Sequence, residues 1–242
     1  MHLIVALLTI AAASDLQPVL PRLIAAFEKE TGHTVRATFG SSGNFFAQIR
    51  DGAPFDVFLS ADNTYPQQLE AAGLTEPSTL MSYATGSIVL WARRGSGVDV
   101  RSGWNALTGD RVKRIAIANP DHAPYGRAAV AALRAAGIYD RVRTKLVLGE
   151  NVAQAAQFVQ SGNALVGIIP LSLAKSPPLA ATGDYADVPP SLYPPIEQSA
   201  VVLRASRNKN AARAFLQYLR RRDVIAVLAA AGFGPAPVHT TR

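Results

Sequence analysis

The chain has 242 residues, of which 49% are hydrophobic and 17% are charged. This composition suffices for one large core or two smaller ones and excludes collagen, coiled-coil and low-complexity chains. The longest apolar run, residues 3–13, is shorter than the roughly 18 to 20 residues that span a bilayer, and the absence of cysteine excludes disulfides, thiolate metal sites and cysteine nucleophiles.

The net charge of +7 favours an anionic partner, which could be nucleic acid, an anionic surface or a small anion. Much of the excess falls near the C-terminus, where Asp223 is the only acid close in sequence. Apolar residues occupy another face of the same predicted helix, so the pattern indicates a solvated surface rather than a nucleic-acid stripe. The cations concerned are Arg204, Arg207, Lys209, Arg213, Arg220, Arg221 and Arg222.

The N-terminus runs from Met1 and His2 straight into apolar residues without a basic segment, which is a poor secretory signal. We therefore interpret Leu7 to Ala13 as a buried first strand. If the protein is exported, its signal peptide is absent from this chain or replaced.

Short apolar runs alternate with segments of helical period along the chain, which is typical of an α/β protein. The predicted strands are Leu7–Ala13, Thr34–Phe39, Asp56–Ser60, Ser87–Ala92, Arg114–Ala118, Lys145–Leu148, Leu165–Ile169 and Ser199–Arg204. The predicted helices are a first one from Leu16 to Gly32, then Asn44–Arg50, Tyr65–Ala72, Gly126–Ala136, Val152–Ser161, Lys209–Arg221 and Asp223–Ala231. Pro21 predicts that the first helix is kinked or that its regular part starts late.

Seven of the 16 prolines lie between Pro170 and Pro195, which predicts a long irregular return crossing. We expect a first connection near residues 84–87 and a second near 195–199, acting together as a hinge. One lobe then comprises residues 1–84 plus 199–242, with both termini, and an inserted lobe comprises residues 85–198.

Four strand-to-helix junctions carry small, hydroxyl or amide residues where a helix is predicted to begin. Ser14 and Gln17 have the spacing of a capping box at the first, and Ser41 or Ser42 caps the second. The third and fourth junctions have the sequences Pro124-Tyr125-Gly126 and Asn151-Val152-Ala153-Gln154.

Each helix start leaves backbone N–H groups without intrahelical acceptors and therefore attracts an anion. In open α/β sheets such turns gather at the carboxyl ends of the strands, where small ligands bind. With two junctions in each lobe, we expect one anion in the interlobe cleft. A single Ser or Asn at a helix start more often serves only as a cap, so the combination of four carries the prediction.

Several stretches resemble, in the same order, the periplasmic molybdate-binding proteins of molybdate ABC transporters. They are Ala11-Ala-Ala-Ser, Phe39-Gly-Ser-Ser-Gly, Gly52-Ala-Pro-Phe-Asp-Val-Phe-Leu-Ser-Ala-Asp, Asn119-Pro-Asp-His-Ala-Pro-Tyr-Gly and Ala231-Gly-Phe. The resemblance implies a type II two-lobed periplasmic binding fold, each lobe a mainly parallel sheet flanked by helices. It also implies a periplasmic protein that binds molybdate or tungstate and delivers it to a membrane permease driven by an ATPase. We expect a monomer without nucleic acid, cofactor or protein-coordinated metal cation.

Transferred residue by residue, the resemblance implies hydroxyl and N–H donors from Ser14 and Ser42, and backbone N–H donors from Tyr125 and Val152. Many family members have a tyrosine where this chain has Pro170, which can donate no hydrogen bond. We hypothesise that the Tyr125 hydroxyl compensates. Asp15 is a further candidate backbone donor, and we expect its carboxylate to turn outward, because an inward carboxylate would repel a dianion.

A cage of donors alone rejects hydrogen phosphate, whose proton would face other donors, while sulfate must be rejected by size. Arg127 and Lys175 lie near these turns in sequence, but we do not assign them to the site.

The alternatives are another oxyanion such as sulfate or phosphate, an iron complex, a regulator's ligand-sensing domain, or an enzyme. Only Tyr185 and Tyr193 hint at iron, and their proline-rich surroundings favour a loop. No helix-turn-helix segment accompanies the predicted lobes. Catalysis is disfavoured because the four histidines are scattered and the Ser41 region lacks a nucleophile elbow.

Overall fold

The computed structural model describes residues 5–237, which divide into two compact units, unit 1 with residues 5–85 and 197–237 and unit 2 with residues 86–196. Each unit contains a five-stranded mixed sheet, with strand order β2-β1-β3-β10-β4 in unit 1 and β7-β6-β8-β5-β9 in unit 2. Within the described residues, no helix has the length and apolar character needed to cross a membrane.

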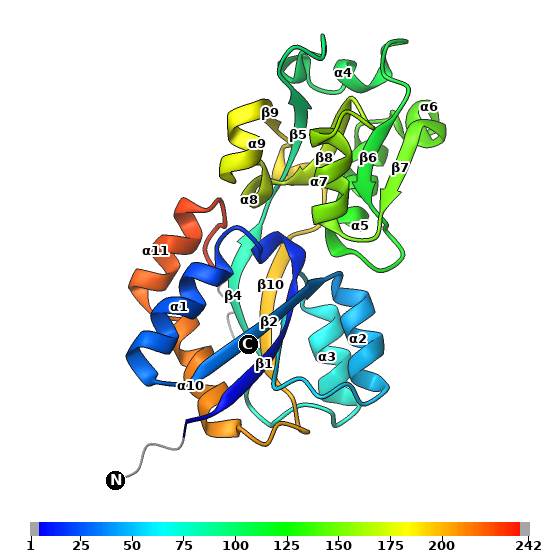
Figure 1. The fold of residues 1–242 in the computed structure, drawn as a ribbon. Helices are drawn as coiled ribbons and strands as arrows, with labels where there is room; N and C mark the ends of the chain where they lie inside the picture. Colours follow the sequence, from blue (N-terminus) through cyan, green and yellow to red (C-terminus); the bar gives the residue numbers. More distant parts are fainter. Residues whose placement is uncertain (1–4, 238–242) are drawn as a thin grey trace. The chain divides into compact units, whose positions relative to one another are not determined.

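Unit 1 places helices on both faces of its sheet (Figure 1). Alternate residues of a strand point to opposite faces, so Ile10 packs with α1, α10 and α11, whereas Ala11 packs with α2 and α3. Its strands are β1 Leu7–Ala13, β2 Thr34–Gly40, β3 Val57–Ser60, β4 Met81–Gly86 and β10 Ile196–Val202. Its helices are α1 Leu20–Thr31, α2 Ser42–Arg50, α3 Thr64–Ala71, α10 Lys209–Leu219 and α11 Arg222–Ala230.

The strand β1 runs parallel to β2 and β3, and β10 runs antiparallel to β3. The register pairs Ala13 with Gly40, so the carboxyl ends of β1 and β2 lie side by side. The two turns that follow these strands are therefore neighbours.

Unit 2 repeats the arrangement with shorter elements. Its strands are β5 Ile88–Arg93, β6 Ile115–Ala118, β7 Leu146–Gly149, β8 Val166–Pro170 and β9 Gly183–Asp187. Its helices are α4 Asn105–Thr108, α5 Pro124–Ala135, α6 Tyr139–Val142, α7 Val152–Gln160, α8 Leu171–Ala174 and α9 Pro177–Thr182. The strand β6 is parallel to β7 and β8, which brings three carboxyl ends to one edge, and β5 is antiparallel to β8 and β9.

All eight predicted strands are present, and Leu7–Ala13 is the first strand as predicted. Gly32, Gly73, Gly137, Gly162 and Gly232, which follow helices, all have positive φ, the conformation that commonly ends a helix. The regular part of α1 begins late, at Leu20, with Pro21 in its first turn, where a missing N–H costs nothing.

Two strands were not predicted. Residues 170–195 are not a long irregular crossing: Pro177 opens α9, and β9 follows as an edge strand paired with β5. Strand β4 ends within the predicted connection near residues 84–87. Its polar residues and Gly86 interrupt the alternation of apolar and polar residues by which a strand is recognised in a sequence. Both strands lie at the edge of their sheets, where burial imposes less apolar alternation.

The basic residues near the C-terminus are partly paired with acids, both nearby in sequence and remote from them. Lys209 and Arg213 contact the Glu76 carboxylate at 2.6 and 2.8 Å, and Arg221 contacts Asp223 at 2.7 Å and also Glu30. Hydrogen bonds from Lys209 and then Arg213 lower the pKa of Glu76 below its ordinary value. This surface is a network of solvated ion pairs.

Candidate functional site

The Ser14 turn differs from the prediction. Ser14 does not cap a long helix: Ser14–Leu16 is a three-residue 3-10 turn whose N-cap is Ala13, without a side-chain cap. The Ser14 hydroxyl instead donates to the Gly40 carbonyl oxygen at 3.1 Å. The adjacent ends of β1 and β2 bring the two groups together for this bond.

Ser41 and Ser42 have different roles at the start of α2. Ser41 is the N-cap, with extended backbone, and its Oγ accepts from the Asn44 N–H at 3.4 Å. The buried Ser42 is the first helical residue, and its Oγ accepts from the Ala61 N–H, after β3, at 2.9 Å. Because that bond occupies an oxygen lone pair, the Ser42 hydroxyl keeps its hydrogen for donation.

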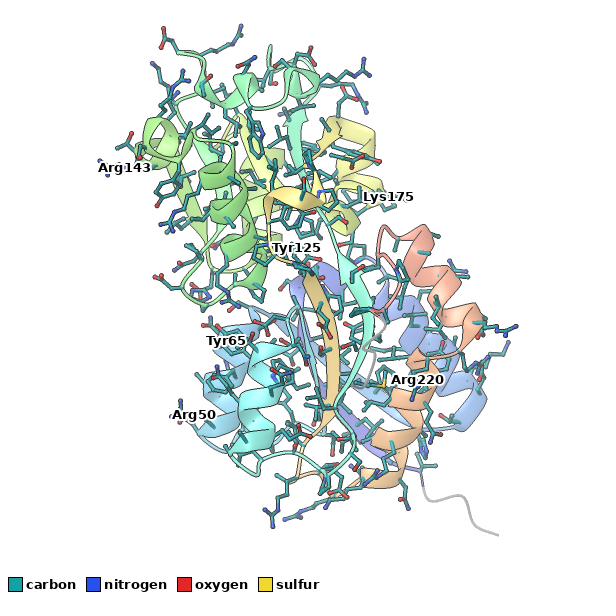
Figure 2. All side chains as sticks on the ribbon, turned by 180° about the vertical axis from the view of Figure 1, so that it is seen from behind. Arg50, Tyr65, Tyr125, Arg143, Lys175 and Arg220 are labelled. Atoms are coloured by element: carbon teal, nitrogen blue, oxygen red, sulfur yellow. The ribbon has the colours of Figure 1, made fainter. Side chains whose placement is uncertain are left out.

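Tyr125, which is labelled in Figure 2, lies in the first turn of α5. The helix begins at Pro124, two residues before the predicted start, and its N-cap Ala123 has no side-chain oxygen to accept from first-turn N–H groups. A Cβ on Gly126 would lie 2.2 Å from the Ala118 carbonyl oxygen, so only glycine lets this turn sit directly on the end of β6. Tyr125 itself is 3% exposed.

Val152 begins α7 after the predicted N-cap. The Asn151 Oδ1 accepts from the N–H groups of Ala153 and Gln154 at 3.0 and 3.1 Å, so the cap does not use the N–H of Val152. The loops before α5 and α7 are joined by a hydrogen bond of 2.8 Å from the Asn119 N–H to the Gly149 carbonyl.

The expected outward orientation of Asp15 is wrong. Its side chain is fully buried, and its Oδ2 accepts from Gln198 Nε2 at 2.9 Å. Gln198 Oε1 in turn accepts from the Tyr83 hydroxyl at 3.4 Å. Burial, and then the charge of Asp15, raise the pKa of Tyr83 well above its ordinary value, so this phenol stays a donor. Sequence reasoning missed Gln198 and Tyr83, which are about 180 and 70 residues from Asp15 and share no motif with it.

The remaining residues considered in the sequence lie on strands, at helix ends or at the surface. Pro170 ends β8, at the same edge as β6 and β7, and offers no donor there. Arg127 and Lys175 are exposed; Lys175 follows α8 and is labelled in Figure 2. Tyr185 lies on strand β9 rather than in the expected loop, and the Tyr193 hydroxyl accepts from the Ile88 N–H at 3.3 Å. Within residues 5–237, no cluster of three or more His, Asp or Glu residues could hold a metal ion.

Two α/β units, built from both ends and from the middle of one chain, define the two-lobed fold of solute-binding proteins. The chain belongs to the bacterial extracellular solute-binding protein family, whose model matches residues 8–234.

Comparisons with individual proteins agree with this family. The chain is 40% identical to molybdate-binding protein ModA of Azotobacter vinelandii over 225 residues, which cover 93% of this chain and 88% of that protein. It is 36% identical to molybdate-binding protein ModA of Rhodobacter capsulatus, over 92% of this chain and 86% of that one. The solved Azotobacter vinelandii periplasmic molybdate-binding protein superposes with a TM-score of 0.87 at 34% identity, covering 95% of this chain and all of that one. These relatives are binding proteins and not enzymes.

Proposed function

We propose that this protein binds molybdate in the periplasm and delivers it to the membrane permease of an ABC transporter, and that tungstate binds in the same way. Support comes from the molybdate-binding relatives at 40% and 36% identity, which align over nearly the whole chain. The protein acts as a monomer in this proposal, and the segments near residues 84–87 and 195–199 serve as its hinge.

The proposed ligand donors are the hydroxyl and N–H of Ser42, the N–H groups of Tyr125 and Val152, and the turn of Ser14 and Asp15. The observation that carries this assignment is the bond from the Ala61 N–H to Ser42 Oγ, which occupies one of the two acceptor lone pairs of the hydroxyl and leaves its O–H to be donated. At the start of α7, the Asn151 side chain accepts from the N–H groups of Ala153 and Gln154, so the cap does not use the N–H of Val152. In the bound state Ser14 exchanges its bond to Gly40 for a bond to the anion, or contributes through its backbone.

A site of this kind distinguishes oxyanions by their protons. Molybdate and tungstate only accept hydrogen bonds at neutral pH, whereas hydrogen phosphate must also donate one. When the O–H of hydrogen phosphate faces a fixed protein donor, neither of these two groups finds an acceptor. Each such unsatisfied buried group costs about 1–3 kcal/mol. Sulfate carries no proton, so it must be discriminated by size.

Isothermal titration calorimetry with molybdate, tungstate, sulfate and phosphate tests the proposal. We expect tight one-to-one binding of molybdate and tungstate, and binding of sulfate and phosphate that is weaker by at least about 100-fold, or about 2.7 kcal/mol. A thermal-shift screen gives an independent readout, since a ligand at 100 times its Kd stabilises the native state by about 2.7 kcal/mol. The absence of binding by both molybdate and tungstate would refute it, and a preference for sulfate or phosphate would reassign the cargo.

A further inference from the structure

The Asp15 side chain occupies an unusual place for an anion-binding turn, because a buried carboxylate belongs to a residue whose backbone is a proposed ligand donor. We infer that Asp15 is a positioning residue: its carboxylate, held by Gln198, fixes the turn of Ser14 and Asp15, and its charge limits the affinity for a dianion. The inference rests on the proposed function and extends it to a residue that sets the strength of binding.

The first part of the argument is geometric. The 3-10 turn has no side-chain cap, and backbone bonds from Gln17 to Ser14 at 3.3 Å and from Val19 to Leu16 at 3.0 Å hold its exit. Such a turn does not hold a fixed orientation by itself.

Two side-chain bonds anchor the turn to the sheet. Ser14 Oγ is bonded to Gly40 at the end of β2, and Asp15 Oδ2 is bonded to Gln198 on β10. Gln198 is oriented by Tyr83 on β4, so the hydroxyl, the amide and the carboxylate form a chain in which every donor points toward Asp15. All three side chains are buried within unit 1, where exchange with water does not weaken the chain.

The second part is electrostatic. The Asp15 N–H is a proposed ligand donor, so the carboxylate of the same residue lies close enough to the anion for the two negative charges to repel, and burial weakens the screening of this repulsion by water. The Asp15 carboxylate therefore opposes binding while its hydrogen bond supports it. Asparagine retains the acceptor and the volume but loses the charge, whereas alanine loses both the acceptor and the charge.

Both substitutions remove the charge and only alanine removes the acceptor, so the difference between the two variants isolates the contribution of the hydrogen bond. We expect Asp15→Asn to bind molybdate at least about fivefold more tightly than the unaltered protein, and Asp15→Ala to bind it at least about fivefold more weakly than Asp15→Asn. Gln198→Leu should also weaken binding. The double variant, Asp15→Ala with Gln198→Leu, should bind molybdate no more weakly than whichever single variant binds it more weakly, because each substitution removes the same hydrogen bond. Calorimetry at a temperature well below each variant's unfolding midpoint provides the measurement.

Asp56 provides the matched control. It is another buried aspartate of unit 1, bonded to Thr9 and Ser206, and it lies at the opposite ends of β1 and β3 from Ser14. Asp56→Asn changes the net charge by the same amount and should destabilise the fold without changing molybdate affinity.

The outcomes separate the inference from the proposed function. If the unaltered protein does not bind molybdate, both fail. If it binds and Asp15→Asn is weaker or unchanged, or if Asp56→Asn tightens binding equally, the inference alone is overturned. An affinity of Asp15→Ala equal to that of Asp15→Asn, whatever the two melting temperatures, also overturns it, since a purely structural role of the hydrogen bond would lower stability only.

Discussion

Replacement of Ser42 by alanine is the sharpest test of the donor arrangement in unit 1. The hydroxyl has one bond that the structure shows, accepted from the Ala61 N–H at 2.9 Å, and one that the proposed function adds, donated to the oxyanion. A hydrogen bond to a charged group contributes about 1.5–3 kcal/mol, so molybdate affinity should fall by about 10- to 150-fold. Calorimetric titration of the folded variant measures this loss directly.

The same substitution leaves the Ala61 N–H without its acceptor in a buried position, which should cost about 1–3 kcal/mol of unfolding free energy. Ser206→Ala is the control: its buried Oγ donates to Asp56 Oδ1 at 2.6 Å, so a similar loss of stability is expected with no loss of affinity. Denaturant titration measures both stabilities. Unchanged molybdate affinity in Ser42→Ala, or an equal fall in Ser206→Ala, would refute the assigned role of the hydroxyl.

Three further predictions concern other parts of the chain. Tyr125→Phe should lower molybdate affinity by about tenfold in calorimetry if its hydroxyl compensates for Pro170, and unchanged affinity removes that hydroxyl from the site. Gly126→Ala should destabilise the protein by more than about 3 kcal/mol in denaturant titration, because the new Cβ would lie 2.2 Å from the Ala118 oxygen; a loss below about 1 kcal/mol would contradict the packing. Glu76→Gln should reduce stability at neutral pH, and because Lys209 and a neighbouring arginine lower the pKa of Glu76 below its ordinary 4.5, the difference from the unaltered protein should disappear as the pH falls through that lowered value. A difference that persists in acid would assign the effect to packing.

The fold was predictable from the sequence where burial imposes a strong pattern. The central strands β1, β3, β6 and β8 are continuous apolar runs between helix-period segments, and they lie where the sequence places them. The edge strands β4 and β9 have one weakly buried face and prolines or glycines nearby, so neither alternation nor hydrophobicity distinguishes them from loops.

The sequence was sufficient to predict which turns form the candidate site, but not the hydrogen-bond partners of the side chains in those turns. The Asn151 cap follows from spacing, because the capping side chain and the N–H groups that donate to it are neighbours in sequence. The partners of Ser14, Ser42 and Asp15 are the exceptions, since Gly40, Ala61 and Gln198 become neighbours only when the strands pair. A motif that consists of local residues carries no information about such bonds, and the orientation of Asp15 was wrong for this reason.

The separation of charge from binding groups explains how a basic protein can still select among anions. The net charge of +7 acts over a Debye length of about 8–10 Å in salt, so it raises the rate of encounter with any anion alike. Cations such as Lys209 and Arg213 are engaged by Glu76, whereas the proposed ligand groups at the strand ends are uncharged hydroxyl and amide donors with fixed directions. Salt should therefore slow association with molybdate while leaving the ratio of molybdate to phosphate affinity nearly constant. A ratio that collapsed with salt would mean that side-chain cations, and not oriented neutral donors, carry the discrimination.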